Sequence, residues 1–512
     1  MKKNSIYKLF ILLLPLLIYN SCSDFMDVNK DPRYPAVAGT PLLFSSGVTW
    51  SASRLGRDGQ LVGALWMQHY AQNNAANQYK PMDSYNVATN STEPTAIWQA
   101  MYSGALPDFR IAIDQAEANG EWNYWLPSKV MMAFDFHILA SFFETIPFSE
   151  ALVGEENLAP KYDDGPSVDA GIIKLLDDAI AKKSDAAALA SIGTKDFVFG
   201  GNIDNWVKFA KTLKLKILMR SFDTNKSAIQ ALLTENDLLT TADARMTGFV
   251  DEVNKSNPLY ESDRRALNTT ENIRLSATLV DFLLAYKDPR IAIFGETVTK
   301  NTDGSAAPAN TYRGLDQGSA DSFTQAMFPT PAHSRARLAA TDPVYFMSVA
   351  ECYFLKAEAY ARLGDAANAK TNYDSGVKAA FTRWNLDGSP FVAAGGAYEF
   401  QSGNQDAMLK SILTQKWIAS ARCQAWDAFF DQCRTGIPAI GSQTVDLYNA
   451  GQVVKEKNPA YVLGTLAPSI YSVLPAGDFP RRFLYVKTSS DYNPNAPKAD
   501  DNPISKKMWW HK

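Results

Sequence analysis

The sequence predicts a mainly α-helical protein that contains tetratricopeptide-like helical repeats and long loops. Apolar residues recur at helical spacing in several long segments, and segments with the alternation of a β-strand are few. One segment has the pattern of two antiparallel helices joined by a glycine turn. Long polar loops separate the helices, at residues 73–95, 251–272, 299–342 and 385–405. Loops of this length are uncommon in compact domains unless they have a function.

The clearest helical hairpin lies between Pro343 and Trp384. Small and aromatic residues recur along its first helix, namely Ala350, Phe354, Ala357 and Ala361. The second helix repeats the pattern with Ala369, Tyr373, Val377 and Phe381, after a turn at residues 363–365 (LGD). Such a hairpin cannot bury its apolar faces alone, so we expect several to stack.

Three further segments have a helical pattern. Residues 204–222 place apolar side chains on one stripe, and Asp204 is a candidate N-terminal cap. Residues 128–146 form an apolar helix that Pro147 closes, and residues 168–184 have one apolar face. Together with the hairpin, they predict the helical fold class.

The N-terminus is typical of a secreted lipoprotein. Residues 1–21 contain Lys2, Lys3 and an apolar run over residues 9–18, which is too short to span a membrane and fits a signal peptide. Cys22 follows directly and is the predicted lipidation site, because cleavage before it would leave a cysteine to carry acyl chains. A plain secretion signal followed by a coincidental cysteine is the alternative. Residues 22–40 are polar and proline-punctuated, which predicts a tether.

Composition argues against several classes of function. Lys and Arg number 50 and Asp and Glu number 54, so the net charge of −4 gives no field that would attract nucleic acid. The four histidines show no metal-ligand spacing, and no nucleotide or hydrolase motif is present, so we expect no metal, no cofactor and no enzyme activity. A glycosidase needs only two carboxylates, so an α-helical glycosidase stays open.

Three cysteines remain after Cys22. Cys352 and Cys423 lie within helical patterns, which favours buried free thiols. A disulfide between Cys423 and Cys433 stays open at this stage.

Several segments together resemble the SusD/RagB family of nutrient-binding lipoproteins of Gram-negative bacteria, and its SusD-like branch in particular. The similarity lies in the order and spacing of five stretches: residues 29–32 (NKDP), 146–151 (IPFSEA), 345–362 (YFMSVAECYFLKAEAYAR), 415–436, which begins with QKWI, and 480–495. Val486 departs from the proline that commonly follows the tyrosine in the last stretch.

The resemblance implies that residues 41–512 form a single SusD-like α-helical domain. In it, tetratricopeptide-like helix pairs form a helical repeat scaffold, and a loop-rich half binds ligand. It implies a surface-exposed outer-membrane lipoprotein, anchored by its lipid, that binds nutrient oligosaccharides without catalysis. The implied partner is a SusC-type TonB-dependent transporter, which the protein would cover as a lid. Peptide capture, as in RagB, is an alternative ligand, and a pure scaffold that holds other surface proteins is a further one.

Sugar sites combine aromatic platforms with planar polar side chains, which directs attention to three loops. The candidate ligand-binding residues are Gln72, Asn73, Asn74, Asn77, Gln78, Tyr79 and Tyr85 in the first loop, Arg264, Asn268 and Asn272 in the second, and Tyr312 and Phe323 in the third. Turn and capping chemistry is the alternative explanation for the amides of the first loop. We expect Trp66 and Trp98 in the core, and Lys356, Glu358, Lys416 and Arg434 in structural ion pairs.

Overall fold

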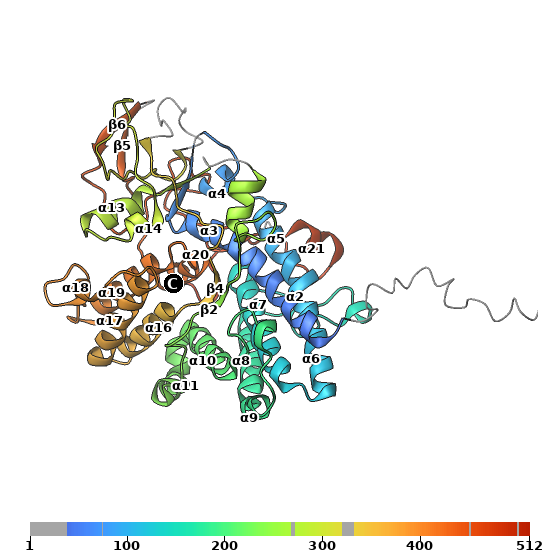
Figure 1. Cartoon of the computed structure of the whole chain (residues 1–512). Helices are drawn as coiled ribbons and strands as arrows, with labels where there is room; N and C mark the ends of the chain where they lie inside the picture. The colour runs from blue at the N-terminus through green and yellow to red at the C-terminus, as the bar shows by residue number, and fades with distance from the viewer. Residues whose placement is uncertain (1–37, 74, 268–271, 320–331, 450–451, 499–500) are drawn as a thin grey trace, which may run out of the picture.

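The computed structural model describes residues 38–73, 75–267, 272–319, 332–449, 452–498 and 501–512. Within these residues the chain is mainly helical, which confirms the predicted fold class. The helices fan across the lower part and the right of Figure 1, whereas β5, β6, α13, α14 and long loops occupy its upper left. The signal peptide, Cys22 and all of the tether except residues 38–40 lie outside the described residues.

The first helices form one flank of the molecule. They are α2 (Thr40–Arg54), the π-helical turn η1 (Leu55–Gly59), α3 (Gln60–Trp66), α4 (Lys80–Asp83), α5 (Thr92–Ala100), η2 (Met101–Ala105), α6 (Leu106–Asn119) and α7 (Trp122–Phe143). Helix α3 packs closely against α20 (Ala425–Thr435). A Cβ atom on Gly63 would lie 2.2 Å from the backbone nitrogen of Trp426, so this approach requires glycine.

Further helices, most of them long, form the scaffold together with α20. They are α8 (Gly165–Ala181), α9 (Lys183–Ala187), α10 (Ile203–Leu218), α11 (Phe222–Glu235), α16 (Val349–Arg362), α17 (Ala366–Thr382), α18 (Ser389–Val392) and α19 (Gln405–Ser420). The predicted hairpin is α16 and α17, which pack against each other, and α16 also packs against α19. Gly364 lies in the turn between α16 and α17 and has a φ of +80°.

Helix boundaries differ from the sequence prediction at three places. Asn202, not Asp204, caps α10, because its side chain accepts a hydrogen bond from the Asn205 backbone at 3.0 Å. Helix α8 begins at Gly165, where the Asp164 carboxylate accepts from the Ser167 backbone at 2.8 Å. Helix α7 begins earlier and ends at Phe143, before Pro147, because Glu144 adopts a φ of +72°.

Strands are short and pair in twos. Antiparallel pairs join β1 (Tyr70–Gln72) to β3 (Ile273–Leu275), β2 (Ala244–Met246) to β4 (Val344–Met347), and β5 (Asp446–Asn449) to β6 (Gln452–Lys457). Short helical segments complete the described chain: η3 (Gly154–Glu156), η4 (Gly193–Lys195), η5 (Met219–Ser221), α12 (Pro258–Tyr260), η6 (Glu261–Ala266), α13 (Ala277–Ala285), α14 (Ile291–Phe294) and α21 (Lys487–Tyr492).

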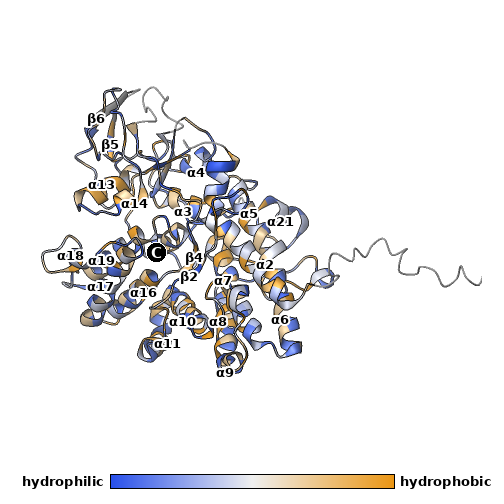
Figure 2. Cartoon of the chain, viewed as in Figure 1, coloured by the Kyte–Doolittle hydropathy of each residue, from blue (hydrophilic) through white to orange (hydrophobic). Residues whose placement is uncertain are grey.

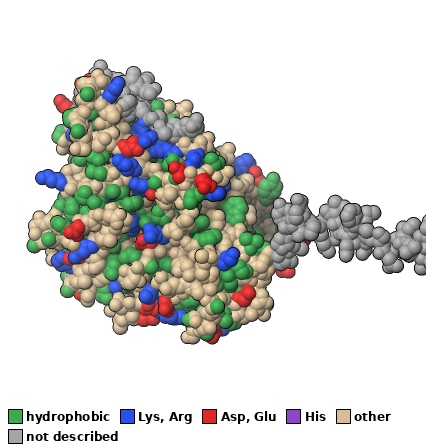
Figure 3. Space-filling model, viewed as in Figure 1, with side chains coloured by type: hydrophobic (Ala, Val, Ile, Leu, Met, Phe, Trp, Pro, Cys, Tyr) green, Lys and Arg blue, Asp and Glu red, His purple; other side chains and the backbone are tan. Residues whose placement is uncertain are grey.

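Aromatic rings fill the interior between the first helices and the scaffold. Trp66 is fully buried and meets the rings of Phe429 and Phe483 edge-on, at 4.9 and 5.5 Å between centroids. Phe483 also stacks on Phe142 at 4.2 Å. Figure 2 shows α13 as mainly hydrophobic, and Figure 3 shows positive and negative side chains intermingled on the face in view.

A buried ionic network links the scaffold helices. Lys416 of α19 pairs with Asp427 and Asp431 of α20, and Arg434 pairs with Glu358 of α16. The predicted structural role is therefore confirmed for Glu358, Lys416 and Arg434. Lys356 differs, because its ammonium group donates instead to Asn236 Oδ1 at 2.8 Å.

The three cysteines of the described region are free thiols. Cys352, Cys423 and Cys433 are all buried, and no disulfide joins Cys423 to Cys433. Burial raises the pKa of each thiol to about 12, so these side chains are held in the neutral form. The prediction of buried free thiols at Cys352 and Cys423 is confirmed.

Candidate ligand-binding surfaces

Hydrogen bonds to β1 and β3 close the first predicted loop. Asn73 donates its backbone N–H to the Asn272 carbonyl oxygen at 2.7 Å. The Gln72 side chain donates to the carbonyl oxygens of Asn73 at 2.8 Å and Asn272 at 3.2 Å. Its Oε1 accepts the backbone N–H of Tyr79 at 2.8 Å. Gln72 therefore fixes the path of the loop from residue 72 to residue 79.

Asp263 joins the first and second loops. Its carboxylate accepts from the Tyr79 hydroxyl at 3.1 Å, from Asn272 Nδ2 at 3.0 Å and from Arg264 Nη1 at 2.8 Å. Arg264 also donates to the Ala336 carbonyl oxygen at 3.0 Å. Burial raises the pKa of Asp263, and the Arg264 charge acts in the opposite direction. We call Gln72, Tyr79, Asp263, Arg264 and Asn272 the loop-anchoring cluster.

The structure thus brings several predicted ligand residues together, but it buries them. Gln72, Asn73, Tyr79, Tyr85 and Asn272 are all buried, and the Tyr85 ring packs edge-on against Phe479. The side-chain bonds of the loop-anchoring cluster run among its own members and to the backbone. Its evident role is to hold the loops in place, as turn chemistry would, and direct ligand contact by these residues stays a prediction.

Other candidates of these loops reach the surface. Asn77 and Gln78 are exposed, and Tyr312 is half-buried against the core. Asn74, Asn268 and Phe323 lie outside the described residues.

Sequence reasoning missed Tyr471, an exposed ring on the same loop-rich half. Its side chain is 53 % exposed. The neighbouring Val473 donates its N–H to the Ser84 carbonyl oxygen at 3.2 Å, and Ile470 donates to the Gln317 carbonyl oxygen at 2.8 Å. Tyr471 is therefore fixed beside the first and third loops. The available signal was a tyrosine in a short stretch that Pro468 and Pro475 bound.

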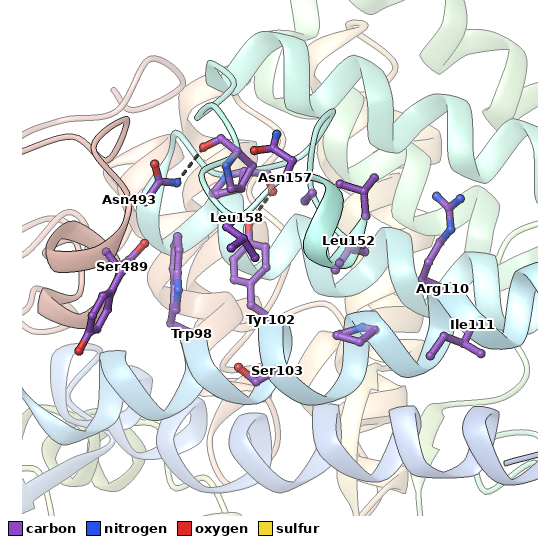
Figure 4. A pocket seen from close by; sticks show the side chains of 17 residues that line it. Trp98, Tyr102, Ser103, Arg110, Ile111, Leu152, Asn157, Leu158, Ser489 and Asn493 are labelled. Carbon is purple, nitrogen blue, oxygen red and sulfur yellow. Dashed lines mark hydrogen bonds between the residues drawn. The ribbon is translucent and has the colours of Figure 1, made fainter. Parts of the chain in front are cut away.

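A separate pocket of about 670 Å³ lies beside α6, and we call it the α6 pocket (Figure 4). Its walls are α5, η2 and α6, the loop of residues 147–160, and the C-terminal end of α21. Trp98 and Tyr102 lie on one wall of the pocket. The Trp98 ring also stacks on the Tyr162 ring, with 6.1 Å between the ring centroids. Trp98 is buried, as predicted for a core residue, and it also lines this pocket.

Several polar groups at the α6 pocket already have partners within the protein. The Tyr102 hydroxyl donates to the Pro147 carbonyl oxygen at 2.7 Å, and Asn493 Nδ2 donates to that of Pro160 at 2.8 Å. Ser489 bonds the Tyr162 hydroxyl at 2.5 Å, and burial raises the pKa of Tyr162 to about 12. Two segments that carried the family resemblance, residues 146–151 and 480–495, thus line one pocket, although no site was predicted there.

In the part of the chain that the structure describes, no group of three or more His, Cys, Asp or Glu side chains is arranged to bind a metal ion. None of the described helices combines the length and apolar character needed to cross a membrane.

Comparison with known proteins places the chain in a family. The family model described as "Starch-binding associating with outer membrane" matches residues 43–458, most of the chain. The chain belongs to the SusD-like family. This finding confirms the predicted resemblance to SusD/RagB proteins. No curated protein matches the sequence.

Solved structures share the SusD-like fold at low sequence identity. A chitin-binding protein superposes with a TM-score of 0.69 and 19 % identity, covering 92 % of this chain and 100 % of its own. A chitin-binding SusD homologue from Flavobacterium johnsoniae gives 0.68 and 20 %, covering 92 % and 97 %. A SusD/RagB family protein from Bacteroides thetaiotaomicron gives 0.66 and 22 %, covering 93 % and 99 %.

Proposed function

We propose that this protein captures oligosaccharides at the outer face of the outer membrane and passes them to a SusC-type TonB-dependent transporter, without catalysis. The match of residues 43–458 to a family of starch-binding, outer-membrane-associated proteins carries the proposal. Two structures of the same fold are of proteins named as chitin-binding, which supports a glycan over a peptide.

We place the glycan-binding surface on the loop-rich half, over the loop-anchoring cluster. Asn77 and Gln78 offer exposed amides that match sugar hydroxyls, and Tyr312 and Tyr471 offer rings that can stack on a sugar face. The loop-anchoring cluster fixes the loop that carries Asn77 and Gln78, and backbone hydrogen bonds of Ile470 and Val473 hold Tyr471 in place. Loops that are fixed before a ligand arrives lower the entropy lost on binding. Asn74, Asn268 and Phe323 belong to the same proposed surface by sequence.

The proposed anchor is Cys22, exposed by removal of the signal peptide of residues 1–21. Acyl chains on Cys22 would hold the protein to the outer membrane, and residues 22–40 would act as the tether to the domain of residues 41–512. Mass spectrometry of the protein from membranes tests this arrangement, because a chain that begins at an acylated Cys22 is expected.

Calorimetric titration of the mature chain against plant, host and microbial oligosaccharides tests glycan capture. We expect binding to at least one class, and we expect Tyr471→Ala and the Asn77→Ala/Gln78→Ala pair each to weaken it about tenfold, which is about 1.4 kcal/mol. Tyr492→Ala is the matched control, because it also removes an exposed tyrosine ring, 84 % exposed, but one that lies at the α6 pocket and away from the proposed glycan surface. It should leave glycan affinity unchanged.

Other outcomes separate the remaining functions. Silence across the glycan panel with binding to peptides would replace glycan capture by peptide capture. Release of reducing sugar during incubation would show a glycosidase. Binding of neither ligand class, with stable capture of other surface proteins, would leave a scaffold.

A further inference from the structure

Four large apolar side chains stand exposed around the mouth of the α6 pocket. Their exposed fractions are 47 % for Ile111, 38 % for Val153, 79 % for Leu158 and 84 % for Tyr492, and we call them the apolar rim. Single exposed apolar residues are ordinary on protein surfaces, but a group around one concavity marks an interaction site. Figure 4 shows Leu158 over Tyr102 of η2, and it shows Ile111 farther along the same ribbon, in α6.

The interior of the α6 pocket suits an apolar guest better than a sugar. Tyr102, Ser489 and Asn493 are bonded to other groups of the protein, as described above. Asn157 is similarly engaged, because it donates to Glu150 Oε2 at 3.2 Å and accepts from the Ala159 N–H at 3.2 Å. A glycan would lose bonds to water here and gain few in return. An apolar side chain of a protein partner would lose none.

The position of the α6 pocket points to a partner in the membrane. The first described residue, Ala38, is held to α6 because its carbonyl oxygen accepts from Gln115 Nε2 at 3.1 Å. Ile111 lies four residues earlier in α6, about 6 Å along the helix axis. Residues 23–38 can span at most about 55 Å from the proposed acylated Cys22. The Ile111 end of the apolar rim therefore lies about one helical turn from the point where the tether joins the domain.

Exposed apolar groups continue from the rim onto α2, the first helix after the tether. Trp50 is 43 % exposed and lies across η2, because a Cβ atom on Gly104 would come within 2.7 Å of its ring. Ser103, the residue before Gly104, lines the α6 pocket. Trp50 thus lies one residue along η2 from the lining of the pocket, which suits an extended partner surface with one deep anchor point.

We propose that the α6 pocket and its apolar rim receive an apolar side chain from an extracellular loop of the SusC-type transporter. This inference rests on the proposed function, since it names the surface that meets the proposed partner. Arg110, paired with Asp114 at 2.9 Å and half exposed, supplies a polar edge beside the apolar centre, as in many protein interfaces.

Docking to the cognate SusC-type transporter, purified in detergent, tests the inference by surface plasmon resonance. We expect the double variant Leu158→Asp/Tyr492→Ser of the mature chain to bind the transporter at least tenfold more weakly than wild type. The matched control is Val253→Asp/Leu284→Asp, which alters side chains that are 66 % and 46 % exposed elsewhere, and it should dock normally. Oligosaccharide titration of both variants should give wild-type affinity.

The outcomes distinguish this inference from the proposed function. Normal docking of the Leu158→Asp/Tyr492→Ser variant would overturn the inference alone. Wild-type protein that binds glycans but never the transporter would overturn both the inference and the transporter proposal. Loss of oligosaccharide binding with docking unchanged would make the α6 pocket a ligand site and overturn the inference, while glycan capture would stand.

Discussion

Arg434 and Glu358 form a bidentate ion pair within the scaffold, with Nη1 2.7 Å from Oε1 and Nη2 2.7 Å from Oε2. The pair joins α20 to α16, and both side chains are almost fully buried. Burial is the largest single influence and favours the protonated carboxyl, but the charge and hydrogen bonds of Arg434, together with the charge of Arg362, hold the pKa of Glu358 below its usual value. The pair therefore stabilises the contact between two scaffold helices as long as both charges are present.

We expect Glu358→Gln to lower the free energy of unfolding at pH 7 by about 3–5 kcal/mol, because it leaves the buried Arg434 without its full counter-charge. Urea denaturation measures the change. The control Glu252→Gln removes an exposed partner of Lys255 and should cost less than about 1 kcal/mol. Because the native pKa of Glu358 is lowered, its stabilisation is complete above the ordinary carboxyl pKa of about 4 and is lost as pH falls through the native pKa. Wild type and Glu358→Gln should converge in stability below that native pKa. Equal losses of stability in Glu358→Gln and Glu252→Gln would contradict the stabilising role of the Arg434–Glu358 pair.

The helical hairpin could be predicted because its signals are local. Ala, aromatic and glycine spacing within residues 343–384 is enough to place α16, the turn and α17. The partner of Lys356 could not be predicted, because Asn236 lies 120 residues earlier and only packing brings it near. The sequence suggested an ion pair for Lys356, but its ammonium group instead donates a hydrogen bond to the side-chain amide oxygen of Asn236.

The candidate site was predictable only in part, for a physical reason. An amide such as Gln72 looks the same in sequence whether it binds a ligand or a backbone carbonyl, and the structure shows the second. The sequence named the first and second loops separately, and only the fold shows that Asp263 joins them. The α6 pocket had no sequence signal, because residues as distant as Trp98, Leu158 and Tyr492 meet only in the fold.

Asp58 gives stability a pH dependence of the opposite sign to that of Glu358. Its carboxyl is buried in η1, and burial raises its pKa to about 7 although Arg57 and Arg54 act against this. The native state therefore holds a proton that the unfolded chain releases near pH 4, so raising the pH from 5 to 8 disfavours folding.

We expect wild type to lose about 3 kcal/mol relative to Asp58→Asn between pH 5 and pH 8, because the amide stays neutral throughout. Urea denaturation at the two pH values measures the difference. Asp185→Asn, which changes a half-exposed carboxylate on α9, serves as the control and should show no such trend. A wild type that gains stability against Asp58→Asn over this range would show that the carboxyl is charged in the native state.

The buried thiols allow a count that also tests lipidation. Cys352, Cys423 and Cys433 are buried and their pKa values are raised to about 12, so a thiolate reagent at pH 8 should modify none of them in the folded protein. In denaturant, protein isolated from membranes should show three reactive thiols, because acylation would occupy the fourth cysteine, Cys22. Four reactive thiols would contradict lipidation of Cys22, and rapid labelling of native protein would contradict burial.

Gly364, in the turn between α16 and α17, tests how much the left-handed backbone conformation of this turn contributes to stability. Its φ is +80°, and a Cβ atom there would meet nothing within 4 Å. Gly364→Ala should therefore cost about 1–2 kcal/mol from backbone strain alone. Gly403 also has open space around it, but its φ is not in the left-handed region, so Gly403→Ala should be neutral or slightly stabilising. Because neither substitution alters packing, the difference between their urea midpoints measures the left-handed turn itself. Similar midpoints would mean that the hairpin closes without that conformation.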